Sequence, residues 1–333
     1  MKKNIIRKLI LSVSSLAATA VCLTSTTYAW FAKNATAWAD LFSIDIEVPE
    51  GLLISIDGEN YKQDLTSDDV KTSIAGTPEA FNKLKFSGVT PLQDSNNKVD
   101  YDDEAHEVKF GADVIDEHSG KHEYVAARVN KDYIKFHVWL QGTSKKFSPD
   151  DLMITVGDNT VVSAETKKVP LLTGFTVGSK TYQAGEEISI NLANAIRLGF
   201  YSHNETENKF KIFEVDDEET DLGTTAIEGK TDEHNPENNI MYNYYNAIFP
   251  LSPFEQAATW GEAYQTKTSY GHTTDEGWMG EFVTGVNQQG IAEVDIYLWL
   301  EGWDADYLLN PLDPNMKASE INATIAFALE AKV

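Results

Sequence analysis

Apolar and polar residues alternate in several separate stretches of the chain. The alternation covers residues 42–48, 134–140, 196–200, 294–300 and 321–329. A period of two places the apolar side chains on one face of an extended strand. One-sided strands of this kind are typical of antiparallel sheets that bury one face against a core. We therefore predict a mainly β protein, built most simply from two packed antiparallel sheets.

Two of these stretches resemble each other, with IKFHVWLQG at 134–142 and VDIYLWLEG at 294–302. Equivalent core strands in the two halves of a sandwich explain the likeness better than a duplication of the sequence. Trp139 and Trp299 fall on the face opposite to the aliphatic residues. We expect them to fill a second packed layer, with a binding platform as the alternative.

Long acidic loops separate the strands. Residues 94–107 and 214–239 are rich in Asp, Glu and Asn, and we interpret them as surface insertions rather than as a separate domain. Helices should be few and short, with candidates at 78–85, 239–248 and 254–264. The aromatic-rich residues 243–278 have no clear place in this scheme.

The N-terminal segment has the features of an export signal. Basic residues at 1–8 precede a run without charge at 9–32, and small residues occupy the two positions that signal peptidase reads, at Thr27 and Ala29. We predict a signal peptide at 1–29, cleaved between Ala29 and Trp30. An uncleaved membrane anchor is the alternative, but its many Ser and Thr residues make the run poorly hydrophobic. Lipidation at Cys22 is disfavoured because Val21 precedes it.

The charge of the chain limits its partners. The formal net charge is -25, and because four basic and no acidic residues lie before Trp30, the remainder has 23 basic and 52 acidic residues. Contacts with phosphates need Lys and Arg, so the acidity argues against nucleic acid or an anionic membrane surface as a partner. We attribute the acidity to solubility outside the cell, with a cation-binding surface as the alternative.

No catalytic motif is present in the sequence. The only cysteine, Cys22, lies in the predicted signal peptide, and the pair His118 and His122 lacks the glutamate of a zinc-protease helix. Asp304 and Asp306 are calcium candidates, but they lack the spacing and glycine of an EF-hand loop, so solvated surface charge is the better explanation. We expect a protein that is not an enzyme and has no cofactor, with calcium as the one alternative.

The sequence TTYAWF at 26–31, followed by an alternating strand and by PEGLLISI at 49–56, resembles the SipW-type signal peptides and first strands of TasA/camelysin-like surface proteins of Gram-positive bacteria. INATIAFALEA at 321–331 is similar to the last core strand of that group, and LWLEGWDAD at 298–306 to a segment of related proteins. The likeness is specific at 27–31 and absent across the middle of the chain.

This resemblance implies a secreted jelly-roll β-sandwich, processed by a SipW-type signal peptidase and assembled with copies of itself into filaments of the extracellular or biofilm matrix. Residues 30–48 would form a donor strand that completes the sheet of the next subunit, and residues 49–333 the sandwich domain. The residues that would carry the assembly are Trp30, Phe31, Phe42, Ile44, Ile46 and Val48. The protease activity associated with camelysin finds no supporting residues here.

Two other functions stay open. The first is a monomeric surface module that binds a glycan or a host ligand, which predicts that residues 42–48 pair within their own sheet. The second is a secreted hydrolase with an unrecognised site, which requires a pocket with convergent carboxylates or a metal.

Overall fold

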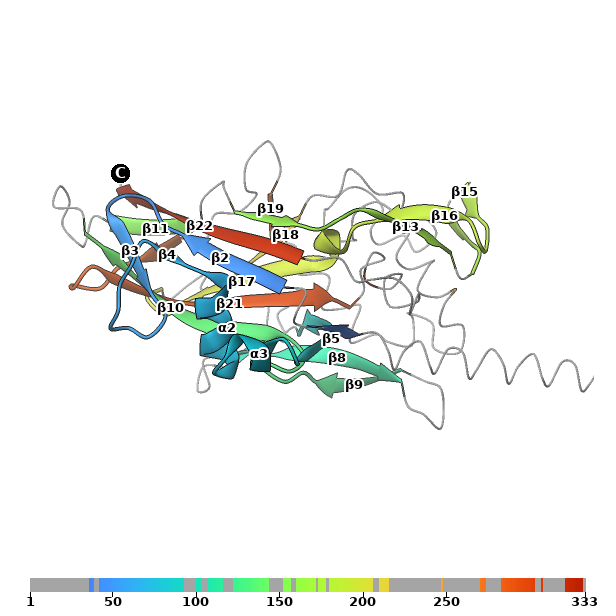
Figure 1. The fold of residues 1–333 in the computed structure, drawn as a ribbon, viewed down its shortest axis with the longest axis horizontal. Coiled ribbons are helices and arrows are strands. Elements are labelled where there is room, and N and C mark those ends of the chain that lie inside the picture. The colour runs from blue at the N-terminus through green and yellow to red at the C-terminus, as the bar shows by residue number, and fades with distance from the viewer. Residues whose placement is uncertain are drawn as a thin grey trace, which may run out of the picture.

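The computed structural model describes residues 36–38, 42–92, 100–102, 107–115, 122–143, 152–156, 160–171, 173–177, 180–205, 210–215, 247, 270–273, 283–302, 307 and 321–331. In this part of the chain the fold is mainly β, and its strands form mixed sheets packed as a sandwich (Figure 1). The prediction of a mainly β sandwich is confirmed. The signal segment and the calcium candidates Asp304 and Asp306 lie outside the described residues.

The larger sheet has ten strands. Its centre is the ladder of β10 and β21, which runs antiparallel from the pair Ile134 and Leu298 to the pair Gln141 and Ile291. The strands are β1 (Thr36–Trp38), β3 (Leu52–Ser55), β5 (Lys85–Pro91), β8 (Phe110–Ile115), β9 (His122–Ala126), β10 (Ile134–Gly142), β17 (Ile196–Ser202), β18 (Phe210–Val215), β19 (Tyr270–Thr273) and β21 (Ile291–Glu301).

The second sheet has six strands, and β22 lies at its centre between β2 on one side and β11 and β12 on the other. The strands are β2 (Phe42–Glu47), β4 (Asp64–Leu65), β11 (Leu152–Val156), β12 (Val161–Ser163), β20 (Val283–Gly285) and β22 (Ile321–Ala331).

Three small two-stranded sheets complete the β structure. Two of them, formed between residues 167 and 190, extend from one end of the sandwich as an arm (Figure 1), and the rings of Phe175 and Tyr182 stack across it with centroids 4.6 Å apart. The strands are β6 (Tyr101–Asp102) with β7 (Glu107–Val108), β13 (Lys167–Pro170) with β16 (Glu187–Ile190), and β14 (Phe175–Val177) with β15 (Lys180–Tyr182).

Most ladders are antiparallel, as the alternation predicts, but three of the described pairings are parallel. β2 runs parallel to β22, β5 to β21, and β18 to β19. These strands are far apart in the sequence, so no short turn constrains their direction, and the alternation within one strand carries no information about it.

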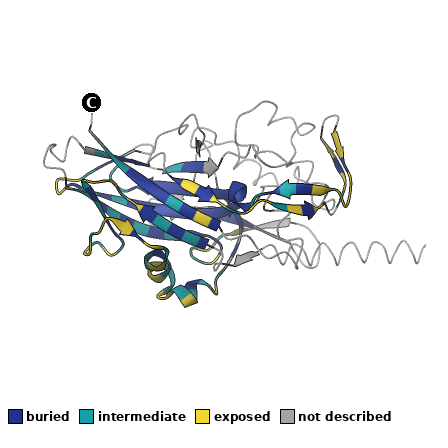
Figure 2. Cartoon of the chain, turned by 45° about the horizontal axis from the view of Figure 1, so that its top comes forward, coloured by how far each residue is buried: buried dark blue, intermediate teal, exposed yellow. Residues whose placement is uncertain are grey.

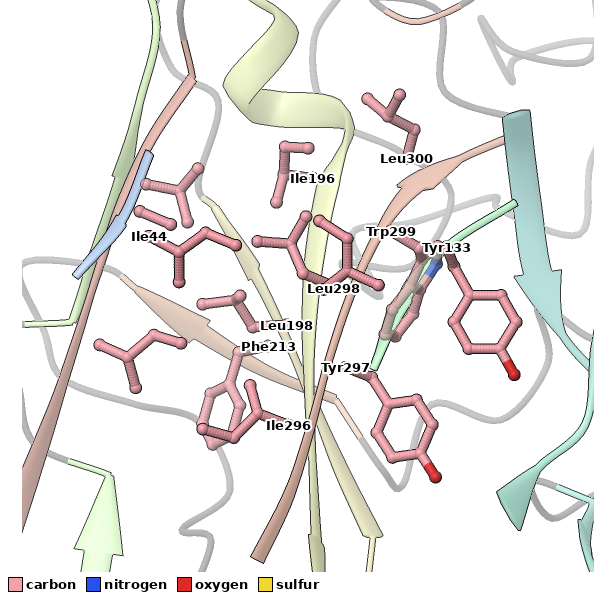
Figure 3. Close-up of a cluster of buried hydrophobic side chains, with 14 of the residues drawn as sticks. Ile44, Tyr133, Ile196, Leu198, Phe213, Ile296, Tyr297, Leu298, Trp299 and Leu300 are labelled. Carbon is pink, nitrogen blue, oxygen red and sulfur yellow. The ribbon is translucent and has the colours of Figure 1, made fainter. Parts of the chain in front are cut away.

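The main core lies between the two sheets. β2 and β22 contribute Ile44, Ile46 and Ile325, and the facing sheet contributes the aliphatic residues of β10, β17 and β21; all are fully buried or nearly so. Figure 3 shows Ile196, Leu198, Ile296 and Leu298 on the side of the central strands that faces Ile44. Buried residues concentrate in the sandwich strands, and the helices and the tip of the arm are more exposed (Figure 2).

Two short helices follow β4, α2 (Ser67–Ala75) and α3 (Pro78–Phe81), and a 3-10 helix, η3 (Leu192–Ala195), precedes β17. The prediction of a short helix from Pro78 is right in position but too long, and α2 was not predicted. Its signals are nonetheless in the sequence. Thr66 and Asp69 form a capping box, and Gly76 ends the helix in the left-handed conformation with φ of 81°.

The larger sheet branches at the end of β21. β10 pairs with β21 as far as Leu298, and then β5 takes the same edge at Leu300 and Glu301. From β5 the sheet continues to β8 and β9, and Phe110 of β8 packs edge-on against Trp299 with ring centroids 4.9 Å apart. The branch therefore places a second, aromatic layer over the face of β21 that points away from the main core.

Gly88 of β5 packs closely against Tyr307 and the backbone of Gly302 at this branch. Its backbone N–H donates to the hydroxyl of Tyr307 at 2.7 Å, and a Cβ atom at this position would collide with the Tyr307 ring and lie 2.8 Å from the Cα atom of Gly302. We predict that Gly88→Ala lowers the free energy of unfolding by about 1–3 kcal/mol, because the Gly302 backbone must move to admit the methyl group.

Chemical denaturation of the two proteins measures this difference. Gly185→Ala is the control, since nothing lies within 4 Å of an added Cβ there and only the cost of its φ of 81° remains. Equal destabilisation by the two substitutions would contradict tight packing at the branch.

Candidate functional site

The outward face of the central ladder carries a group of polar and aromatic side chains. Along β10 the residues of this face are Lys135, His137 and Trp139; along β21 they are Glu293, Asp295, Tyr297 and Trp299. The register sets His137 directly opposite Asp295. The two similar segments are thus neighbouring antiparallel strands, and their polar positions meet across the ladder.

The two tryptophans on this face differ in role. Trp299 is buried, packs against Phe110, and donates through Nε1 to the carboxylate of Glu301 at 3.1 Å. Figure 3 shows Trp299 and Tyr297 on the side of β21 opposite to the aliphatic residues, next to Tyr133. The prediction of a second packed layer is confirmed for Trp299. Trp139 is half-buried beside His137, with ring centroids 4.2 Å apart.

Asp295 is the centre of a polar cluster at the open end of this face. Its side chain is only 5% exposed, and its Oδ1 lies 2.6 Å from Nδ1 of His137. Its Oδ2 lies 3.0 Å from Nε2 of His203, the residue that follows β17. An ionised carboxylate only accepts hydrogen bonds, so His137 donates through Nδ1. We call His137, His203 and Asp295 the histidine–aspartate cluster.

Two further charges border the cluster. The ammonium of Lys135 lies 3.3 Å from Oδ2 of Asp295 and 3.6 Å from Oε1 of Glu107. Glu293, half-exposed, has Oε2 3.6 Å from Nε2 of His137. Burial by itself raises the pKa of Asp295, but the two imidazoles and the ammonium outweigh burial, so the pKa lies below its ordinary value and the carboxylate is charged at neutral pH.

A network of hydrogen bonds fixes the backbone at His203. The His203 N–H donates to the carbonyl oxygen of Glu293 at 3.0 Å. The next residue, Asn204, accepts from the N–H of Glu293 at 2.8 Å and donates to the carbonyl oxygen of Ile291 at 3.3 Å. These contacts bind the end of β17 to β21, so the His203 side chain is held next to Asp295.

The predicted assembly residues are found at a different place, in the second sheet. Phe42, Ile44 and Ile46 of β2 are buried, and Val48 is partly buried against the same core. β2 pairs with β22 of its own chain along its whole length and with β4 only at Ile46 and Glu47. The other residues of the prediction, Ala29, Trp30 and Phe31, lie outside the described residues.

The histidine–aspartate cluster was not predicted from the sequence. The alternation marks His137 and Asp295 only as polar positions of two strands, and the one local signal of a site is that each stands among aromatic residues on its face. His203 lies after a third strand, so its place follows from the pairing of β17 with β21 and not from spacing along the chain.

Chemically the cluster offers two imidazole nitrogens and one carboxylate, whose ligand atoms lie within 4.8 Å of one another. Such a group can hold a metal ion, or it can serve as a buried ion-pair network that joins β10, β17 and β21.

Among the described residues, no helix is long and apolar enough to cross a membrane.

Comparison with known proteins gives no relatives. A scan against protein-family models, a search of curated proteins and a search of solved structures each found no match.

The burial of Asp295 predicts a large effect of neutralising it. Asp295→Asn removes the one anion that faces His137, His203 and Lys135 together, and we expect a loss of about 3–5 kcal/mol in the free energy of unfolding. Thermal unfolding followed by circular dichroism measures the change.

Glu293→Gln is the matched control, because it removes one negative charge from the same face at a half-exposed position. Its effect should stay below about 1 kcal/mol. If the Asp295→Asn protein is as stable as the Glu293→Gln protein, the histidine–aspartate cluster does not contribute to the stability of the fold.

Proposed function

We propose that this chain is a secreted, non-enzymatic structural protein that forms or decorates extracellular filaments, with subunits joined by exchange of the N-terminal strand. The observation that supports the proposal most is the attachment of β2. Three fully buried apolar side chains anchor it to the core, yet β22 is the one strand that it pairs with along its whole length. A strand with deep side-chain pockets and few lateral neighbours is suited to donation.

Exchange costs little because it preserves these contacts. A β2 strand from a neighbouring subunit would find the same six backbone partners on β22, from Phe42 opposite Ile321 to Glu47 opposite Ala326, and the same core pockets. Only the connection between β2 and β3 must change its path. A head-to-tail contact of this kind does not close on itself, so it builds filaments.

The connection is a tight turn. The N–H of Leu52 donates to the carbonyl oxygen of Pro49 at 3.1 Å, and Gly51 has φ of 95°. These features are those of a type II turn, with Gly at its third position. Opening this turn into an extended hinge would release β2 from its own subunit.

The residues before β2 would add to the contact between a donor subunit and its acceptor. β1 pairs antiparallel with β5 in the larger sheet, with Thr36 opposite Ser87, whereas β2 belongs to the second sheet. A donated segment that includes both strands would therefore bind both sheets of the acceptor. Its backbone hydrogen bonds would be distributed over two edges, which favours a stable joint.

A monomeric surface module that binds a glycan or a host ligand is the second candidate. One observation favours it: β2 pairs with β22 of the same chain, as that function predicts. The two candidates differ in where β2 of an assembled sample is found, in its own subunit or in the next.

Engineered cysteines test this difference directly. Ser43 and Asn322 lie opposite each other in the parallel ladder, at a spacing between strands of about 4.8 Å that a disulfide can span. In a protein beginning at Trp30, which has no native cysteine, we expect Ser43→Cys with Asn322→Cys to form disulfide-linked oligomers. Non-reducing gel electrophoresis of assembled material measures them, and electron microscopy should show filaments.

The control pair is Ser163→Cys with Asn322→Cys, which joins β12 to β22 within the body of one subunit. It should give only an intramolecular bond in every state. If the Ser43 pair also gives only intramolecular bonds, and proteins beginning at Trp30 and at Val48 both stay monomeric across pH and calcium, strand exchange is wrong and the surface module takes its place.

The turn at Gly51 gives a second prediction. Gly51→Ala strains the left-handed conformation of the closed turn by about 1 kcal/mol, but it leaves an extended hinge unstrained. We therefore expect the ratio of exchanged to closed protein to rise about fivefold. Analytical ultracentrifugation measures this ratio.

Gly76→Ala is the matched control. It places the same strain, at φ of 81°, at the end of α2, where nothing lies within 4 Å of the added Cβ. This substitution should lower stability without changing the oligomer ratio, and an equal shift in both variants would exclude the turn as the hinge.

A further inference from the structure

We propose that the histidine–aspartate cluster is a binding site for one divalent transition metal ion, with zinc as the expected species. The ligands are Nδ1 of His137, Nε2 of His203 and the carboxylate of Asp295. This inference does not depend on the proposed filament function, because the cluster lies in the larger sheet and β2 lies in the second sheet.

The donor set selects the class of metal. Two imidazole nitrogens and one carboxylate are typical of zinc sites with three protein ligands and an open fourth position. Calcium prefers six to eight oxygen ligands, and magnesium keeps an oxygen shell with several waters. A site whose donors are mostly nitrogen therefore favours zinc and its neighbours in the first transition row.

The three ligand atoms lie close enough together to be compared with a tetrahedral site. Ligand atoms bound to zinc at about 2.0–2.2 Å lie roughly 3.3 Å from one another. Here Oδ1 of Asp295 is 2.6 Å from His137 and Oδ2 is 3.0 Å from His203. The three ligand atoms all lie within 4.8 Å of one another, so side-chain movements of about 1–2 Å would place them around one ion. The imidazole side chains are 26% and 22% exposed, so the cluster is in partial contact with solvent.

Glu293 is placed to provide an outer contact for one of the two histidines, His137. With Nδ1 of His137 on the metal, its Nε2–H points to Glu293, whose Oε2 lies 3.6 Å away. Among the described residues this buried Nε2 atom has no hydrogen-bond partner, so a small movement of the half-exposed Glu293 would complete a carboxylate–histidine–metal arrangement. The rings of Trp139 and Tyr201 flank the two histidines, with centroids at 4.2 and 5.0 Å.

Lys135 is the competing cation of this site. Its ammonium lies 3.3 Å from the same carboxylate oxygen of Asp295 that faces His203. Glu107, 3.6 Å from that ammonium, provides a second anion to which Lys135 can move when the metal enters. The proposal therefore makes a specific prediction: Lys135→Met increases metal affinity because it removes the competitor, although it also removes a charge partner of Asp295.

Cobalt titration of the protein beginning at Trp30 tests the site. Co²⁺ replaces Zn²⁺ in tetrahedral sites and gives strong visible absorption, which Co²⁺ bound to surface carboxylates lacks. After removal of metal with a chelator, we expect one Co²⁺ per chain with tetrahedral bands that zinc displaces. His203→Gln should abolish the bands, Glu293→Gln should weaken binding about tenfold, and Lys135→Met should strengthen it.

Controls separate this site from the acidic surface. His122→Gln removes a histidine of β9, a strand that pairs with β8 and not with β10, β17 or β21, and it should leave the bands unchanged. Histidine side-chain NMR of the unaltered protein gives a readout that needs no variant: zinc should shift Nδ1 of His137 and Nε2 of His203 and leave the other histidines in place.

The proposal is overturned if the unaltered protein shows no tetrahedral cobalt bands at any accessible concentration. It is also overturned if the His203→Gln protein, folded by circular dichroism, retains the bands, or if zinc shifts other histidines instead. After any of these three results, the histidine–aspartate cluster would be an ion-pair network that binds no metal.

Discussion

The antiparallel ladder between β10 and β21 is the interaction on which the rest of the structure depends. Its register sets the aliphatic side chains of both strands toward the second sheet, and the same register brings His137 and Asp295 together on the opposite face. A slip by one residue would move every one of these side chains to the wrong face. The main core and the polar cluster are therefore two results of one pairing.

Two charged residues of the larger sheet are fully buried. They are Arg197 of β17 and Glu301, which lies opposite Val89 of β5 at the branch, and each has hydrogen bonds within the protein. The guanidinium of Arg197 donates to the carbonyl oxygen of Ile196 at 3.1 Å, and Glu301 accepts from Trp299. Such groups are costly to bury, so they are tolerated where hydrogen bonds are available.

Alternation is a local property of a strand, and it predicted five of the strands correctly. The five alternating stretches correspond to β2, β10, β17, β21 and β22. Alternation does not show which strands pair with one another, in which direction, or which strands are covered on both faces. β17 is buried on both faces, including Arg197, and alternation within a strand does not predict a second buried face. The parallel partners of β2 and β5 and the place of His203 were missed for the same reason. The capping box of α2, in contrast, was readable at Thr66 and Asp69.

The position of β22 has a consequence for the order of folding. β22 is the central strand of its sheet, but β2, which pairs with it, precedes it by more than two hundred residues. A chain that emerges from its N-terminus cannot close this sheet until Ala331 has emerged, and pairings between such distant segments form slowly. During that interval the apolar face of β2 stays uncovered. If strands exchange as proposed above, the first β22 strand to emerge, from the same chain or from a neighbouring one, would cover this face, and the local concentration of newly made chains would set the proportion of exchanged subunits.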